Sequence, residues 1–346
     1  MASYDSMYSI IDLDAATAVA AAAAPEKFDE IKSLFSIKEI INPLPNIHNC
    51  ISVSLFYQNP DNEYPEQHQK LDLEYWRNKY YLSLIRFIED FRKSDLGEGG
   101  QWKMRIYLEN SLLQSELVDI NHLFSAARGR DRLEIYHMAT NSIGAQPGML
   151  WRFLAYDDRE LDTAFVCDID DRFEDRRSKI LSFHNSPQHC VFGRYLSYSK
   201  DNFNIDKERN VPPLNYATVI GCMNGMRPKK SGISIKKCMI DYILWRINRV
   251  NTSAKPWEEF DDHDTSRFSA PIRNHKYGWG GWWTVYGFDE RFLKHVIFPY
   301  FARRGEVFTW THEDPNDLEK LPGENPVKID YDFCLGGGRK NVFQRI

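Results

Sequence analysis

Short apolar runs alternate along this chain with longer segments in which apolar residues recur every three or four positions. The short runs are typical of buried strands, and the periodic segments are typical of helices packed against a sheet. A chain that alternates the two is expected to form an α/β fold with a mostly parallel central sheet and helices on both faces. The runs predict strands at 50–57, 103–108, 133–138, 163–167, 191–198 and 306–310, and the periodic segments predict helices at 71–93, 114–127, 235–249 and from Pro147 onward.

The predicted strand at 163–167 leads directly into three carboxylates, Asp168, Asp170 and Asp171. Successive side chains of a strand point to opposite faces, so Asp168 and Asp170 are expected on the same side, about 7 Å apart. Two carboxylates at this spacing repel each other unless a cation lies between them. Mg²⁺ and Mn²⁺ prefer carboxylate ligands and often bridge to substrate phosphates, so the pair predicts a divalent metal site. The plainer interpretation is a solvated acidic turn.

Ligands of parallel sheets bind at the carboxyl ends of the strands, and this rule selects further candidates. Phe56 and Tyr57 end the first predicted strand and could pack against a nucleobase, although they would fit a core equally well. The glycine-containing segment 221–228 is expected to be a loop, in which Asn224 and Arg227 either reach a ligand or have no special role.

The region around Asp168 resembles the Asp-x-Asp region of metal-dependent, nucleotide-sugar glycosyltransferases of the GT-A type. The shared order is a helix, here carrying Arg152, then a short polar turn, a buried strand and an acid pair. A second segment, Tyr286 to Glu290, resembles the family's acidic segment before an amphipathic helix, which is expected here at 292–301. The resemblance covers roughly residues 46–346 and extends to divergent enzymes of large DNA viruses and of bacterial glycan clusters.

The resemblance implies an enzyme, a hexosyl- or pentosyltransferase that uses Mn²⁺ or Mg²⁺. The donor would be a UDP- or GDP-sugar and the acceptor a glycan or another hydroxyl compound. Arg152 matches a family position that approaches the nucleotide or its phosphates. Asp289 and Glu290 match an acidic pair that faces the acceptor hydroxyl or the sugar.

Three residues near the end of the chain match further family positions. His312 matches a downstream metal ligand, although no Gly-x-x-Lys-Pro-like sequence follows it. Arg339 and Lys340 follow three glycines and match a basic tail that folds over the diphosphate. A histidine on a surface turn and a disordered chain end are the plainer interpretations.

Composition narrows the class of protein. The chain has 346 residues, 42% of them hydrophobic and 27% charged, as expected for a soluble globule with a sizeable core. The net charge of −5 provides no broad basic surface for nucleic acid. Six cysteines without paired spacing indicate a reducing, cytoplasmic compartment. No apolar run approaches the roughly 18 residues of a transmembrane segment.

Two regions are expected along the chain. Residues 1–45 contain an Ala-rich tract and are expected to form a helical or disordered extension. Residues 1–40 are expected to be dispensable for chemistry and could support a homo-oligomer. Residues 46–346 are expected to form one GT-A-like domain. Its nucleotide-binding half would be 46–175 and its acceptor-binding half 176–346.

Two other classes of function share these features. A Mg²⁺-dependent nucleotidyltransferase or phosphotransferase also uses paired carboxylates, and a non-catalytic carbohydrate-binding protein would account for the aromatic residues. Trp279, Trp282 and Trp283 are interleaved with glycines and predict either an aromatic loop over a sugar or a bulky packed loop. The sequence leaves the donor, the acceptor and the stereochemistry of transfer open.

Overall fold

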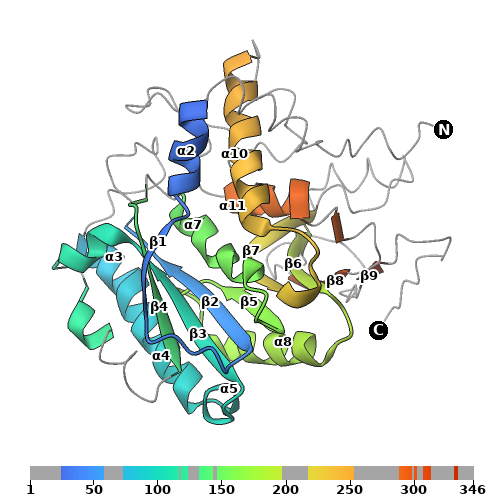
Figure 1. The fold of residues 1–346 in the computed structure, drawn as a ribbon. Coiled ribbons are helices and arrows are strands. Elements are labelled where there is room, and N and C mark those ends of the chain that lie inside the picture. The colour runs from blue at the N-terminus through green and yellow to red at the C-terminus, as the bar shows by residue number, and fades with distance from the viewer. Residues whose placement is uncertain are drawn as a thin grey trace, which may run out of the picture.

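A computed structural model of the chain describes residues 25–57, 73–116, 118–123, 132–142, 146–196, 217–252, 288–297, 300–301, 307–312 and 331–333. Within these residues the strands form one nine-stranded sheet in the order β1-β4-β3-β2-β5-β7-β6-β8-β9 (Figure 1). The strands are β1 (Ile37–Ile41), β2 (Asn49–Leu55), β3 (Trp102–Leu108), β4 (Leu133–Met138), β5 (Thr163–Cys167), β6 (Cys190–Leu196), β7 (Ala217–Met226), β8 (Val307–His312) and β9 (Tyr331–Phe333).

The centre of the sheet is parallel, and the strand order reverses within it. β2 pairs in parallel with both β3 and β5, and β3 pairs in parallel with β4. The chain runs outward from β2 through β3 to β4 and then returns to the other side of β2 as β5. Ligands of open α/β sheets bind outside the carboxyl ends of the strands at such a reversal. The ends of β2 and β5 are therefore the place where a site is expected.

The rest of the sheet is mixed. β7 is antiparallel to β5 and to β6, β6 is parallel to β8, and β8 is antiparallel to β9. At the opposite edge β1 is antiparallel to β4. The expected α/β class is confirmed, and the expected parallel order holds for the centre of the sheet, whereas both flanks include antiparallel pairs.

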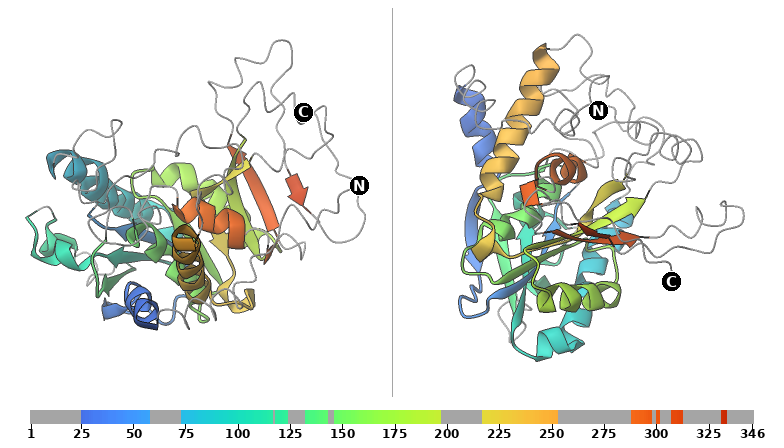
Figure 2. Two further views of the ribbon diagram at one scale, coloured as in Figure 1. Left: turned by 90° about the horizontal axis from the view of Figure 1, so that it is seen from above. Right: turned by 90° about the vertical axis from the view of Figure 1, so that its right-hand side faces the viewer.

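Helices cover both faces of the sheet, as Figures 1 and 2 show. Alternate strand residues face two separate cores. Cys50 and Val166 belong to the core with α2, α10 and α11, and Ile51 and Phe165 belong to the core with α4 and α8. The helices are α2 (Pro25–Ser33), α3 (Leu73–Trp76), α4 (Leu82–Lys93), α5 (Asp95–Glu98), α7 (Gly148–Trp151), α8 (Phe173–Asn185), α10 (Ile235–Thr252) and α11 (Phe288–Phe292).

Short 3₁₀ and π turns complete the helical segments. They are η2 (Arg77–Tyr81), η3 (Asn110–Gln114), η4 (Arg152–Asp157), η6 (Pro228–Lys230) and η7 (Leu293–Ile297). Among the helices that the structure describes, none combines the length and the apolar character needed to span a membrane.

The expected boundary near residue 45 is wrong for residues 25–45, which belong to the fold. Ile31 and Phe35 are fully buried in the core, and β1 extends the sheet beside β4. Lys236 Nζ of α10 donates to the carbonyl of Phe35 at 3.0 Å. A nine-residue helix followed by a mostly exposed edge strand has too little periodicity to be recognised in the sequence. Residues 1–24, with the Ala-rich tract, lie outside the described residues.

The segment 221–228 is expected to be a loop, but its residues 221–226 form more than half of β7, which lies between β5 and β6. The glycines of this segment serve close packing. A Cβ atom at Gly225 would lie 2.5 Å from the ring of Phe183 and 2.9 Å from the ring of Phe165. Gly inside a strand often marks such a close approach, and this cause is not visible in the sequence alone.

The helix expected at 114–127 is interrupted. The η3 turn ends at Gln114, and Ser115 is extended, with φ −98° and ψ 148°. A new helical turn follows Asp119, whose Oδ1 accepts a hydrogen bond from the backbone N–H of His122 at 2.9 Å. Aspartate at this position favours a helix start, so two short elements share one apolar periodicity.

A buried ion network links β3 and β4. Glu134 of β4 accepts from Lys103 Nζ at 2.9 Å and from Arg105 Nε at 3.0 Å. Arg105 also pairs with Asp158 at 2.7 Å, and Lys103 Nζ donates to the carbonyl of Leu44 at 2.8 Å. The side chains of Lys103, Arg105 and Glu134 are almost fully buried. Glu134 and Asp158 together balance the charges of two cations that have almost no access to water.

We predict that Glu134→Gln strongly destabilises the protein, because it leaves Lys103 and Arg105 buried without their shared carboxylate. Breaking a buried pair of this kind costs about 3–5 kcal/mol. The free energy of unfolding in urea measures the effect. Asp95→Asn is the matched control, since the Arg177–Asp95 pair is 38% and 55% exposed, and its loss should cost less than about 1 kcal/mol. Equal losses in the two variants would contradict the prediction.

Candidate functional site

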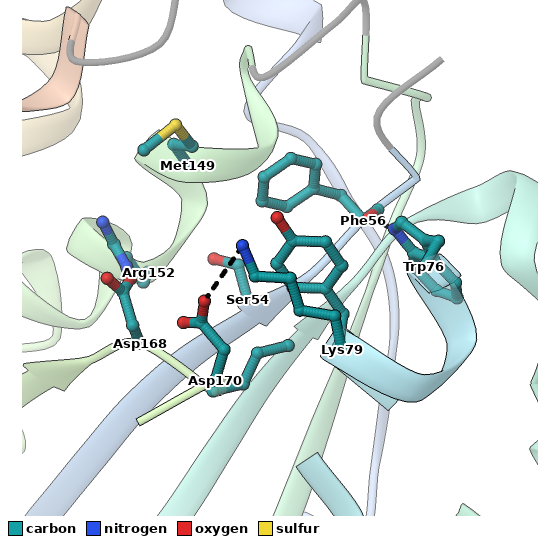
Figure 3. A pocket seen from close by; sticks show the side chains of 10 residues that line it. Ser54, Phe56, Trp76, Lys79, Met149, Arg152, Asp168 and Asp170 are labelled. Atoms are coloured by element: carbon teal, nitrogen blue, oxygen red, sulfur yellow. Dashed lines mark hydrogen bonds and ion pairs between the residues drawn. The ribbon is translucent and has the colours of Figure 1, made fainter. Parts of the chain in front are cut away.

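A pocket lies at the carboxyl ends of β2 and β5, where the strand order reverses (Figure 3). Its volume of about 70 Å³ has room for a few water molecules. The pocket gathers four residues that the sequence singled out, Phe56, Arg152, Asp168 and Asp170. The complete lining is Ser54, Phe56, Trp76, Lys79, Tyr80, Met149, Arg152, Asp168, Ile169 and Asp170.

Each carboxylate after β5 has a cationic partner. Asp168 pairs with Arg152 Nη1, and Asp170 pairs with Lys79 Nζ at 3.6 Å, the contact drawn as a dashed line in Figure 3. Asp171 pairs with Arg176 on α8. The side chains of Asp168 and Asp170 are 32% and 34% exposed. Both carboxylates that line the pocket are thus accessible to a ligand, but each already contacts a side-chain cation.

Arg152 connects the two acidic motifs. Its guanidinium is buried between Asp168 and Asp289, with Nη2 at 2.7 Å from Oδ2 of Asp289. Asp289 lies in the first turn of α11, 137 residues further along the chain. Gly221 of β7 makes room for the pair, since a Cβ atom there would lie 2.4 Å from Asp289 Oδ2 and 3.0 Å from Arg152 Nη2. The fold therefore joins through one side chain two motifs that are distant in sequence.

Asp289 and Glu290 differ in their surroundings. The Asp289 side chain is fully buried, and this burial raises the pKa of its carboxyl group, while the neighbouring Arg152 opposes the rise. Glu290 is partly exposed, and its Oε1 accepts from the backbone N–H of Gly221 at 3.3 Å. Of the two carboxylates, only that of Glu290 has access to solvent.

Aromatic residues form another wall of the pocket. The ring of Phe56 lies against Gly148 at the start of α7, where a Cβ atom would lie 2.2 Å from the ring. Trp76 Nε1 donates to the carbonyl of Phe56 at 3.2 Å, and the rings of Tyr57 and Trp76 meet edge to face at 5.6 Å. Trp76 is fully buried, whereas Phe56 and Tyr80 are partly exposed. Trp76 thus supports the wall from behind, and Phe56 and Tyr80 present ring surface to the pocket.

A π-helical turn, η2, contributes Lys79 and Tyr80 to the pocket. Lys79 Nζ lies 5.1 Å from the centre of the Tyr80 ring. π-Helical turns inside longer helices are frequent at functional sites. Trp76, Lys79 and Tyr80 were missed in the sequence, although their spacing of three and four residues places them on one helix face. That spacing does not reveal which end of which strand the face will meet.

Glu109 ties the end of β3 to the chain that follows β2. It is buried, and its Oε2 accepts from the backbone N–H of Tyr57 at 2.6 Å. Its Oε1 accepts from Ser111 Oγ at 2.5 Å. Burial raises the pKa of Glu109 to about 7. The carboxyl group therefore holds Tyr57 beside the pocket and titrates close to neutral pH.

The side chains around Asp168 can supply oxygen ligands to a divalent cation. One potential ligand atom from each of Asp168, Asp171 and Cys222 lies within 4.8 Å of the others, and Asp170 shares the pocket with Asp168. Burial raises the pKa of the Cys222 thiol to about 12, so this sulfur stays protonated. A thiol is a poor ligand for Mg²⁺ or Mn²⁺, whereas carboxylates suit both ions. The donor set fits a hard cation at Asp168 with a second aspartate.

The remaining predicted site residues lie away from the pocket or outside the described residues. His312 is the last residue of β8 and pairs with Tyr195 of β6. β7 and β6 lie between β8 and β5, so β8 and β5 are about 14 Å apart. The metal role of His312 stays a prediction. Arg339, Lys340 and the segment with Trp279, Trp282 and Trp283 lie outside the described residues.

Several chains of solved structures are similar to this one. A mannosyltransferase from Pyrobaculum calidifontis, in complex with GDP-mannose and Mn²⁺, has 11% sequence identity and a TM-score of 0.29, covering 69% of this chain and 71% of its own. No family model and no curated protein matches the chain. A structural likeness of this size carries no weight on its own, so function has to be inferred from the pocket.

We predict that Glu109 makes the protein less stable as the pH rises from about 4.5 to 7. Its pKa is raised from 4.5 to about 7, so the folded state binds the proton more tightly than the unfolded state does. The stability present below pH 4.5 is lost as the pH rises through the folded pKa. The shift corresponds to roughly 3 kcal/mol. Glu109→Gln should lack this loss.

The measurement is the difference in unfolding free energy between the wild type and Glu109→Gln, determined in urea at pH 5 and at pH 7.5. The wild type should lose stability relative to the variant at the higher pH. Glu98→Gln, at an exposed position on α5, controls for the substitution itself. A difference that is the same at both pH values would show that Glu109 does not titrate as inferred.

Proposed function

We propose that this protein is a metal-dependent glycosyltransferase, which moves a sugar from a nucleotide-diphosphate sugar to a hydroxyl acceptor. The observation that carries the proposal is the pocket at the strand reversal, which combines Asp168 and Asp170 with Arg152 and an aromatic wall. These groups suit the parts of such a donor: carboxylates for a cation on the diphosphate, a guanidinium for the phosphates, and rings for the base.

Asp168 and Asp170 are the proposed ligands of Mn²⁺ or Mg²⁺. A bound ion would act as a Lewis acid that stabilises the negative charge on the departing nucleoside diphosphate. Arg152 contributes a positive charge whose position is set by Asp289 behind it. Fixed charges of this kind act where negative charge develops in the transition state.

The donor base would pack on the partly exposed rings of Phe56 and Tyr80. The pocket residues all lie between 54 and 170, which supports the proposed nucleotide-binding half at 46–175. The acceptor would then be held mainly by residues 176–346. Glu290, next to the buried Asp289, is the proposed general base that takes the acceptor proton. A UDP- or GDP-sugar is the proposed donor and a glycan the proposed acceptor.

We predict that Asp168→Asn and Asp170→Asn each weaken Mn²⁺-dependent binding of UDP or GDP. Mutating a residue that is only hydrogen-bonded to a metal ligand lowers affinity roughly 10–100-fold, so the loss of affinity in these variants should be at least as large. Isothermal titration with each nucleotide, with and without MnCl₂, measures it. Circular dichroism of the variants confirms that they are folded.

Asp171→Asn is the matched control, because Asp171 pairs with Arg176 and is not part of the pocket lining. It should change nucleotide binding little. A strong effect of Asp171→Asn, together with no effect of Asp170→Asn, would transfer the second ligand role to Asp171. Wild-type binding that is unchanged by EDTA would contradict the metal-dependent proposal.

We predict that Glu290→Gln lowers the turnover of sugar transfer by about 10²–10⁴-fold, the usual contribution of a positioned general base. Its dissociation constant for the nucleotide should stay unchanged, because Glu290 does not line the pocket. Asp289→Asn should instead raise the dissociation constant for the nucleotide, since it removes the charge that holds Arg152. Unchanged turnover in Glu290→Gln would rule out the base role.

A further inference from the structure

The two carboxylates of the pocket are both engaged by protein cations. Arg152 forms an ion pair with Asp168 on one side of the pocket, and Lys79 forms an ion pair with Asp170 on the other (Figure 3). A divalent cation on these carboxylates would have to displace both contacts. A cation bound alone would also leave Arg152 and Lys79 facing an ion of their own sign, which is unfavourable in a partly buried site.

A diphosphate bound alone meets the opposite difficulty. Its negative charge would lie beside Asp168 and Asp170, while the cations that could contact it are paired with those carboxylates. When a divalent cation and a diphosphate enter together, their charges largely cancel. The carboxylates can then contact the metal while Arg152 and Lys79 contact the phosphates. No charged group in the pocket is left without a partner of opposite sign.

We infer that Lys79 is a diphosphate-binding residue, and that Lys79 and Arg152 exchange partners, from Asp170 and Asp168 to the phosphates, when metal and nucleotide bind. The inference rests on the proposed function and adds to it a residue and a binding order. In the free protein the two cations compete with the metal. In the complex they hold the donor.

The surroundings of the two cations suit such an exchange. The Lys79 side chain is 38% exposed and its contact with Asp170 is 3.6 Å, the longest of the three ion pairs that follow β5. Arg152 keeps its second contact, to Asp289 at 2.7 Å, when Asp168 is withdrawn. Lys79 can therefore swing on a flexible stem, whereas Arg152 remains in the wall of the pocket.

The exchange makes metal and nucleotide binding depend on each other. Each ligand frees groups that the other needs, so each should raise the affinity of the other by the same factor. Replacing Lys79 should affect metal binding and diphosphate binding differently. The metal loses a competitor and the diphosphate loses a partner, so the two affinities should change in opposite directions.

The test compares the wild type with Lys79→Met. Without nucleotide, Lys79→Met should bind Mn²⁺ about threefold to fivefold more tightly than the wild type, as measured by electron paramagnetic resonance. This factor corresponds to the free energy of the exposed ion pair that no longer competes with the metal. With saturating Mn²⁺, the dissociation constant for UDP or GDP, whichever binds the wild type better, should rise roughly tenfold or more, as expected for a lost charged hydrogen bond. Neither measurement requires turnover.

Lys229→Met is the matched control, because Lys229 forms a similar exposed pair with Asp162 at 2.9 Å outside the pocket. It should change neither affinity. For Arg152 the double variant Arg152→Met/Asp289→Asn removes both charges of the buried pair, so no buried carboxylate is left unpaired to unfold the protein. It should also bind Mn²⁺ more tightly and the nucleotide more weakly.

The outcomes separate the inference from the proposed function. A wild type that binds neither UDP nor GDP with Mn²⁺ would overturn the proposed function and the exchange with it. A wild type that binds one of them, with Lys79→Met changing both affinities in the same direction or neither, would overturn the exchange and leave the proposed function standing. Opposite changes in Lys79→Met, absent in Lys229→Met, would support it.

Discussion

The arrangement of this site depends on the ion pairs of the buried Arg152 guanidinium. The guanidinium pairs with Asp168 at the mouth of the pocket and with Asp289 in the interior. A buried carboxylate and a buried guanidinium are each costly to desolvate, and only their mutual contact offsets that cost. The pair also requires Gly221, because a side chain there would occupy the same space. One guanidinium with two ion pairs thus fixes the end of β5, the start of α11 and the middle of β7 relative to one another.

The sheet explains why the site lies where it does. β5 returns beside β2 after the chain has built β3 and β4 on the other side, so the strand order reverses at the carboxyl ends of β2 and β5, where ligands of open α/β sheets bind. Side chains that follow these two strands meet there with residues from the helical segments on both faces. Charged and aromatic groups are held on rigid elements, which lowers the entropic cost of ordering them around a ligand.

Charge balance links this geometry to the proposed chemistry. The pocket holds acids and cations in contact, so it is nearly neutral before any ligand binds. A metal and a diphosphate, which largely neutralise each other, can replace these internal contacts without leaving a charge unpaired. A site built in this way favours a metal–nucleotide pair over either partner alone, a form of selectivity that arises from the protein's own ion pairs.

The sequence by itself determined the features that depend on neighbouring residues. The apolar run before Asp168, the helix of Arg152 and the alternation of strands and helices were all readable, because burial on one face leaves a local period. Tertiary structure alone decided that Asp289 is buried against Arg152, that Lys79 and Tyr80 reach the pocket, and that 221–226 is a central strand. These facts depend on strand order and on contacts between residues far apart in the chain, which no local period records.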